Sequence, residues 1–100
     1  MNYPFIISPE TELDIEDAFE WYSTQNPQLG SEFVRAIDSA ISKIGTNPFA
    51  YPIIHRQTHR ILLQRFPYRL FYTINQEQQI ISIVGCFHGK RDPKTWRDRL

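Results

Sequence analysis

Basic side chains in the second half of the chain have the types and spacing that phosphate chemistry needs. Arg60 and Arg65 bound one apolar run, Arg69 lies in the next, and His88 follows a third. Arginine holds phosphate charge in bidentate contacts, and imidazole transfers protons near neutral pH. If these side chains converge, they could support RNA cleavage through the 2′-hydroxyl. They also fit plainer roles, because arginines protect sheet edges and a histidine beside a glycine turn is often structural.

Aromatic residues accompany these basic side chains. Tyr68, Tyr72 and Trp96 offer rings on which single-stranded RNA bases could stack. Metal binding has weaker support, because His55 and His59 stand four apart without a glutamate between them in an HExxH arrangement. The four glycines are scattered, and the sequence shows no glycine-rich phosphate loop. We therefore expect neither a metal nor a cofactor.

The net charge of zero conceals two halves of opposite sign. Residues 1–50 contain two basic and eight acidic residues, a net charge of −6, and residues 51–100 contain nine basic and three acidic residues, a net charge of +6. Such asymmetry indicates that the basic half binds a polyanion or an acidic partner. The alternative is two solvated faces of opposite sign. The acidic cluster fits a solvated helix face better than a metal site; it consists of Glu12, Asp14, Glu16, Asp17 and Glu20.

Length and composition bound the class of protein. The chain has 100 residues, of which 41% are hydrophobic and 22% charged, as expected for a single globular domain over residues 1–100. Its one cysteine, Cys86, excludes an internal disulfide and suits a reducing compartment. No apolar run approaches the ~18 residues that span a bilayer, and the N-terminus lacks a signal-peptide pattern. We expect a cytoplasmic protein with no membrane partner.

Cap signals and periodicity predict two helices near the N-terminus. Residues 3–8 read as a short first strand, in which Pro4 implies either a sheet edge or the beginning of the strand. Ser8-Pro9 then begins a helix that continues to about residue 26. Asn26-Pro27 repeats this device and begins a second helix, whose apolar residues keep helical spacing to about residue 44. Because almost no loop separates them, the two helices should form an antiparallel hairpin.

Three strand-like runs follow an irregular stretch at residues 48–57. They cover residues 60–65, 68–74 and 79–87, and their short connections predict antiparallel neighbours. Asp92-Pro93 then caps a short terminal helix. The order β-α-α-β-β-β plus this helix predicts an α+β fold, with a helical hairpin packed on one face of a small antiparallel sheet.

The opposite face of that sheet is then the expected working surface. Strand alternation places Arg69 on the same face as Phe71. It places His88 in phase with Ser82 and Cys86. The strand register, and with it the convergence of the basic residues, cannot be derived from the pattern.

Three segments and one tryptophan resemble a known family. They are residues 14–22 (DIEDAFEWY), 65–72 (RFPYRLFY), 86–93 (CFHGKRDP) and Trp96. Together they resemble the RelE/ParE superfamily of toxins from bacterial type II toxin–antitoxin modules, nearer the ParE, or plasmid stabilisation, branch. The resemblance covers nearly the whole chain. It implies a RelE-like α+β fold and a cytoplasmic toxin that a cognate antitoxin neutralises, with acidic antitoxin residues on the basic surface.

The resemblance implies two kinds of target, because RelE-like members cut mRNA on the ribosome and ParE-like members poison DNA gyrase. Arg69 matches the strand arginine of the nucleases, and His88, Lys90 and Arg91 fall near their C-terminal basic or histidine positions. The lysine-rich patch and the late tyrosine of those nucleases are missing here, unless Trp96 replaces the tyrosine in stacking. These departures favour the ParE-like function.

Three functions therefore stay open. The first is a ParE-like toxin that binds gyrase. The second is a ribosome-dependent endoribonuclease, with Arg69 and Arg91 stabilising charge and His88 donating a proton. The third is a non-toxic module that binds an antitoxin. The residues expected to bind a partner or nucleic acid are Arg60, Arg65, Arg69, Lys90, Arg91, Trp96 and Arg97.

Overall fold

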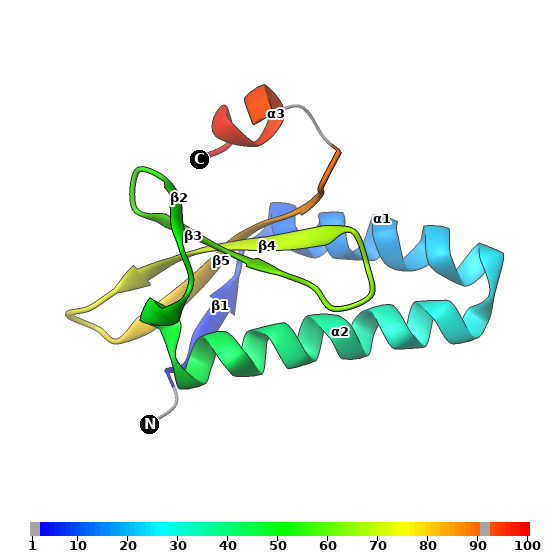
Figure 1. Ribbon diagram of the computed structural model, residues 1–100, viewed down its shortest axis with the longest axis horizontal. Helices are drawn as coiled ribbons and strands as arrows, with labels where there is room; N and C mark the ends of the chain where they lie inside the picture. The colour runs from blue at the N-terminus through cyan, green and yellow to red at the C-terminus, as the bar shows by residue number, and fades with distance from the viewer. Residues whose placement is uncertain (1–2, 91–92) are drawn as a thin grey trace.

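A computed structural model describes residues 3–90 and 93–100 and arranges them in three layers (Figure 1). The hairpin of α1 and α2 covers one face of a five-stranded sheet, and α3 lies against the other. The elements are β1 (Phe5–Ile7), α1 (Pro9–Gln25), α2 (Pro27–Thr46), the 3₁₀ turn η1 (Pro48–Ala50), β2 (Ile53–His55), β3 (Thr58–Leu62), β4 (Tyr68–Asn75), β5 (Ile80–His88) and α3 (Pro93–Arg97). The predicted α+β class is confirmed.

Asn26 serves both helices at the hairpin turn. Its backbone N–H ends α1 by donating to the Tyr22 carbonyl at 3.0 Å, and its Oδ1 begins α2 by accepting from the Gln28 N–H at 2.9 Å. The helices then approach closely at Gly30, where a Cβ atom would collide with Ser23 Oγ of α1. The predicted antiparallel hairpin is confirmed.

The core lies between the hairpin and the sheet. From α2 it takes the apolar stripe that the helical spacing predicts, with Phe33, Ile37 and Ile44 buried. From the sheet it takes alternate residues of the central strands, including the fully buried Tyr72. The Tyr72 hydroxyl donates to the Pro48 carbonyl at 2.6 Å, which satisfies the one polar atom of a large buried side chain.

The sheet has the order β1-β5-β4-β3-β2 and is mixed rather than wholly antiparallel. The pairs formed by β2, β3, β4 and β5 are antiparallel, as expected, whereas β1 runs parallel to β5. Short connections predict antiparallel pairing only between the strands that they join, and β1 is separated from β5 by the helices and three strands. β1 is an edge strand and begins directly after Pro4, so both positions that Pro4 allows are found.

One strand lies where the sequence predicts irregular structure. β2 pairs with β3 at two positions with a shifted register, so its extended form depends on its neighbour rather than on its own pattern. β3 begins at Thr58 and ends at Leu62, earlier at both ends than expected. The expected last residue, Arg65, lies instead in the turn to β4 with a φ of 72°.

A β-bulge changes the alternation along β5. Phe71 pairs with Gly85, but the next residue, Tyr72, pairs with Ile83, so Val84 is the extra residue. The core face therefore changes phase, from Ile81 and Ile83 before the bulge to Cys86 after it. The expectation that Ser82 and His88 share a face is wrong, because a pattern of period two cannot register an inserted residue.

The sheet face opposite the hairpin is not left open. Phe71 and Phe87 on that face are each only 2% exposed. The Trp96 ring of α3 packs edge-on against Phe71, with ring centroids 5.0 Å apart, and Arg99 lies 4.9 Å from the Phe87 ring centroid. The sheet face expected to hold the functional residues is thus partly covered by α3, through the contact of Trp96 with Phe71.

Replacing Ile37 with alanine tests the core. This side chain is 4% exposed, so Ile37→Ala should lower the free energy of unfolding by about 2–5 kcal/mol. Val34→Ala on the same helix is the control, because Val34 is 38% exposed, and it should change that energy by less than about 0.5 kcal/mol. Urea unfolding measures both, and equal losses would contradict the assigned helix face.

Candidate functional site

The predicted arginines lie on the sheet face away from the hairpin. In the antiparallel pair of β3 and β4, Arg60 stands opposite Phe71 and Leu62 opposite Arg69, so both arginines share the face of Phe71. Nε of Arg60 is buried and makes no hydrogen bond to the residues that the structure describes. The predicted pairing of Arg69 with Phe71 on one face is therefore correct.

His88 lies on the other side of the sheet. It pairs across the strands with Tyr68, which packs on the core beneath the hairpin, and the two rings meet edge-on at 5.1 Å. Nδ1 of His88 accepts a hydrogen bond from the Lys90 N–H at 3.0 Å. This bond keeps Nδ1 unprotonated and leaves the proton of the neutral ring on Nε2.

Arg69, His88 and Lys90 nevertheless meet at one end of the sheet. They border a groove of about 330 Å³ beside the turn between β3 and β4. The backbone there is close to the arginine, because a Cβ atom on Gly89 would lie 3.1 Å from an Arg69 Nη atom. Three of the predicted residues thus converge, although Arg69 and His88 reach the groove from opposite faces.

The other predicted residues that the structure describes do not join that groove. Arg65 is exposed in its turn, 3.7 Å from a carboxylate oxygen of Glu32. Trp96 packs on Phe71, and Arg97 lies 5.4 Å from the centroid of the Trp96 ring. Arg91 lies outside the described residues. Trp96 is therefore mainly a packing residue, which the stacking hypothesis does not anticipate.

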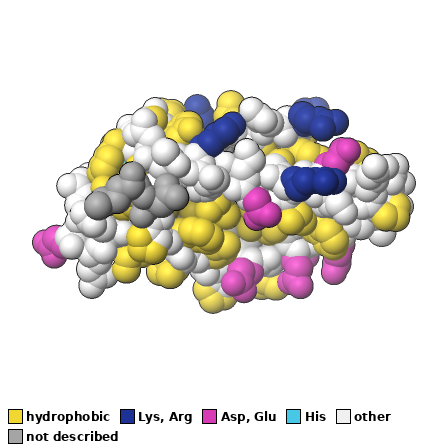
Figure 2. All heavy atoms as spheres, turned by 90° about the horizontal axis from the view of Figure 1, so that it is seen from below, with side chains coloured by type: hydrophobic (Ala, Val, Ile, Leu, Met, Phe, Trp, Pro, Cys, Tyr) yellow, Lys and Arg dark blue, Asp and Glu magenta, His cyan; other side chains and the backbone are white. Residues whose placement is uncertain are grey.

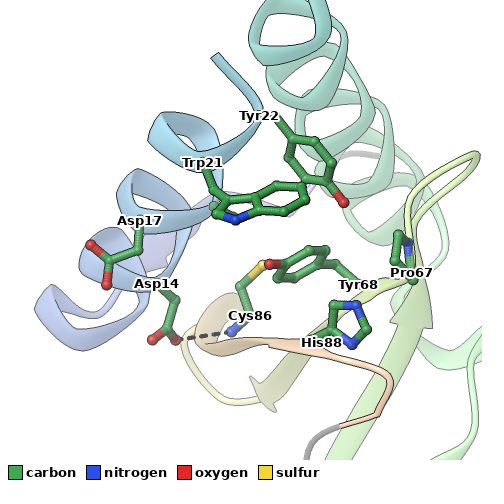
Figure 3. Close-up of a pocket in the computed structure, with 9 residues that line it drawn as sticks. Asp14, Asp17, Trp21, Tyr22, Pro67, Tyr68, Cys86 and His88 are labelled. Carbon is green, nitrogen blue, oxygen red and sulfur yellow. Dashed lines mark hydrogen bonds between the residues drawn. The ribbon is translucent and has the colours of Figure 1, made fainter. Parts of the chain in front are cut away.

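A larger pocket lies between α1 and the ends of β4 and β5 (Figure 3). Its volume is about 530 Å³. The helix side presents two carboxylates and two aromatic rings, and the sheet side presents Tyr68, Cys86 and His88. The α1 residues that line it are spaced as one stripe of a helix: Asp14, Asp17, Ala18, Trp21 and Tyr22.

The Asp14 carboxylate connects three elements at the edge of this pocket. Its Oδ2 accepts from the Cys86 N–H of β5 at 3.2 Å, the dashed bond of Figure 3. Arg99, which follows α3, donates from Nη1 to Oδ1 at 3.1 Å and places Nη2 2.8 Å from Oδ2. Asp14 and Arg99 are both largely buried, so water screens this pair only weakly.

Sequence reasoning missed Asp14, Asp17 and Trp21. It assigned the acids to a solvated helix face, and Asp17 is indeed exposed. The available signal was their spacing with Trp21 along α1, next to the apolar face of the helix. The hydrogen bond between Asp14 and Cys86 could not be predicted from spacing, because Cys86 lies 72 residues further along the chain.

Surface charge is separated in space (Figure 2). On the face shown, lysines and arginines lie mainly along one side and acidic residues mainly along the other, with hydrophobic side chains between them. Phe5, Phe19 and Val34 contribute exposed apolar surface to a groove of about 520 Å³ among β1, α1 and α2. Charges of opposite sign are thus separated on this face of the molecule.

Within the described residues 3–90 and 93–100, no three His, Cys, Asp or Glu side chains are grouped so that they could hold a metal ion. None of the helices in these ranges combines the length and apolar character that crossing a membrane requires.

Comparison with known sequences defines the class of protein. Residues 5–93 match the family model described as the ParE toxin of the type II toxin–antitoxin system parDE. The chain therefore belongs to the ParE toxin family, within the RelE/ParE superfamily that its motifs resemble. No curated protein is significantly similar to it.

Solved structures share the fold at low sequence identity. A chain of the chromosomal ParDE system from P. aeruginosa is 14% identical, with a TM-score of 0.73 over 86% of this chain and 95% of that one. A chain of the RelBE2 toxin–antitoxin complex from Mycobacterium tuberculosis is 17% identical, with a TM-score of 0.62 over 88% and 99%. A free mutant of E. coli toxin RelE is 12% identical, with a TM-score of 0.63 over 99% and 95%.

Removal of the Asp14 carboxylate should destabilise the fold. Asp14→Ala leaves the Cys86 N–H and the Arg99 guanidinium without their acceptor, at a cost of about 1–3 kcal/mol in unfolding free energy. Asp17→Ala, one helical turn away and exposed, should change that energy by less than about 0.5 kcal/mol. Urea unfolding of both variants checks this, and a neutral Asp14→Ala would refute the role of the carboxylate.

Burial of Cys86 should make stability depend on pH. Burial, and secondarily the Asp14 charge, raises the pKa of the thiol from 9.0 to about 12, although Arg99 opposes this. The folded protein holds the thiol proton more tightly than the unfolded chain, so this contribution is full below pH 9 and is lost as the pH rises toward 12. Unfolding free energy should therefore fall more steeply above pH 9 in the native protein than in Cys86→Ala. Identical slopes would contradict the burial of the thiol.

Proposed function

We propose that this bacterial protein acts in the cytoplasm by binding its target, DNA gyrase, and that a cognate antitoxin neutralises it. The observation that carries the proposal is the hydrogen bond from the Lys90 N–H to Nδ1 of His88. In this arrangement Nδ1 is occupied by the Lys90 N–H, and the neutral ring carries its hydrogen on Nε2, so the ring has no free nitrogen with which to accept a proton. A role for His88 in general acid–base cleavage of RNA would therefore require this hydrogen bond to break.

The positions of the arginines support the same proposal. Arg60 and Arg69 stand on the face opposite His88, and Arg60 does not border the groove that Arg69 shares with His88. Trp96, the one candidate to replace the missing nuclease tyrosine, packs on Phe71 instead. Fixed charge without a placed proton carrier suits binding better than catalysis.

An antitoxin partner is supported by family and by charge. The P. aeruginosa and M. tuberculosis structures are described as a toxin–antitoxin system and a toxin–antitoxin complex. In this chain Arg65 and Lys90 are exposed and Arg69 is half-buried, so the end of the sheet offers positive charge to an acidic antitoxin segment. Plasmid stabilisation would follow from such a toxin–antitoxin pair.

A ribosome-dependent endoribonuclease is the second candidate. It is favoured by the groove that Arg69, His88 and Lys90 share. On that hypothesis His88→Ala should abolish mRNA cleavage in cells that express the protein. Continued growth despite tight antitoxin binding would instead support a non-toxic binding module.

Gyrase assays test the proposal directly. The purified protein should inhibit supercoiling by gyrase or trap cleaved gyrase–DNA complexes at micromolar concentration, because binding alone suffices. Relaxation of the same plasmid by a type I topoisomerase is the control and should not change. Absence of any effect on gyrase at that concentration would end the proposal.

Two variants test whether the groove that contains Arg69, at the end of the sheet, is needed for gyrase inhibition. Arg69→Gln removes a charge at the groove and should weaken gyrase inhibition. Lys43→Gln removes an exposed charge from the last turn of α2, away from that groove, and should leave inhibition unchanged. Equal inhibition by both variants would place the gyrase contact elsewhere.

A further inference from the structure

The pocket between α1 and the ends of β4 and β5 has aromatic walls that the proposed function does not use. Trp21 of α1 is 59% exposed, although it is one of the largest apolar side chains. Its ring meets Tyr22 edge-on at 5.1 Å, and Tyr22 meets Tyr68 of β4 at 6.2 Å. Figure 3 shows Trp21 and Tyr68 on opposite walls, so the pocket has aromatic rings on both its helix side and its sheet side.

The charge of this pocket is negative. Two carboxylates line it, and neither Lys nor Arg is among the described residues that do so. Asp14 is already bound by Arg99 and by the Cys86 N–H. Asp17 is exposed and makes neither a hydrogen bond nor an ion pair with residues 3–90 or 93–100. Such a pocket repels phosphate and attracts a cation.

The shape suits a planar cation on a flexible stem. Asp17 and Trp21 are four residues apart on α1 and therefore share one face of the helix. A guanidinium stacks on aromatic rings and forms paired hydrogen bonds with a carboxylate, which an ammonium does less well. The small side chain of Ala18 at the pocket leaves room for the methylenes of an arginine.

We infer that this pocket binds an arginine side chain presented by a protein partner. The guanidinium lies against Trp21 at the edge of the pocket and bonds to Asp17, one helical turn away on the same face of α1. The partner is a protein rather than free arginine, because the unpaired charge of Asp17 repels the α-carboxylate of the free amino acid. The inference goes beyond the proposed function and holds whether or not gyrase is the target.

Nuclear magnetic resonance of the full chain tests this with a blocked tripeptide, acetyl-Leu-Arg-Leu-amide. The chain has two tryptophans, and Trp96 lies on the opposite face of the sheet, so its indole N–H is an internal control. The peptide should shift the Trp21 indole signal saturably and leave that of Trp96 unchanged. The same peptide with citrulline, a neutral isostere of arginine, should cause little shift. Free L-arginine should bind more weakly than the tripeptide.

Variants then identify the carboxylate. Asp17→Asn should weaken tripeptide binding severalfold, whereas Glu20→Gln, an exposed acid of α1 outside the pocket, should not. The amide spectrum of each variant reports whether the fold is kept, and both sites are exposed. Equal binding of the citrulline peptide, an unaffected Asp17→Asn, parallel shifts of both indoles, tighter binding of free arginine, or saturable binding of inorganic phosphate in the pocket would each overturn the inference.

Discussion

The Asp14 carboxylate of α1 binds both β5 and the segment that follows α3, and so connects elements that lie far apart in the sequence. β5 has nine residues, but β1 covers only the stretch Ile81–Ile83, so the outer edge of β5 needs other partners beyond that point. The start of α1 supplies them, because the Thr11 hydroxyl donates to the Ile83 carbonyl at 3.2 Å and Asp14 accepts from Cys86. The same carboxylate binds Arg99 and so ties the terminal helix to the other two layers.

The hydrogen bonds of Asp14 position side chains on both faces of the sheet. On the hairpin side they fix α1 beside the ends of β4 and β5, where the aromatic pocket lies. On the far side they bring Arg99 over Phe87, next to the contact of Trp96 with Phe71. His88, on one face, and Arg69, on the other, meet only at the end of the sheet.

Local patterns predicted the helices well, because their causes are local. The stripe through Phe33 and Ile37 and the double cap at Asn26 need only neighbouring residues. β2 could not be predicted, since its extended form depends on pairing with β3. Nor could the position of His88 relative to Ser82, because the bulge at Val84 arises from the pairing of two strands. The contact of Trp96 with Phe71 could not be predicted either, because it joins residues that are distant in the sequence.

The bulge also bears on how this strand can change in length during evolution. Val84 has no opposite partner in β4, so its deletion would leave every other side chain of β5 on its present face. Deletion of a residue elsewhere in β5, with the bulge kept, would move the residues that follow it to the opposite face. Relatives at 12–17% identity that differ by one residue here should therefore align with the gap at Val84. Because a bulge increases local twist, such a gap would re-aim the His88 end of the strand while keeping its core contacts.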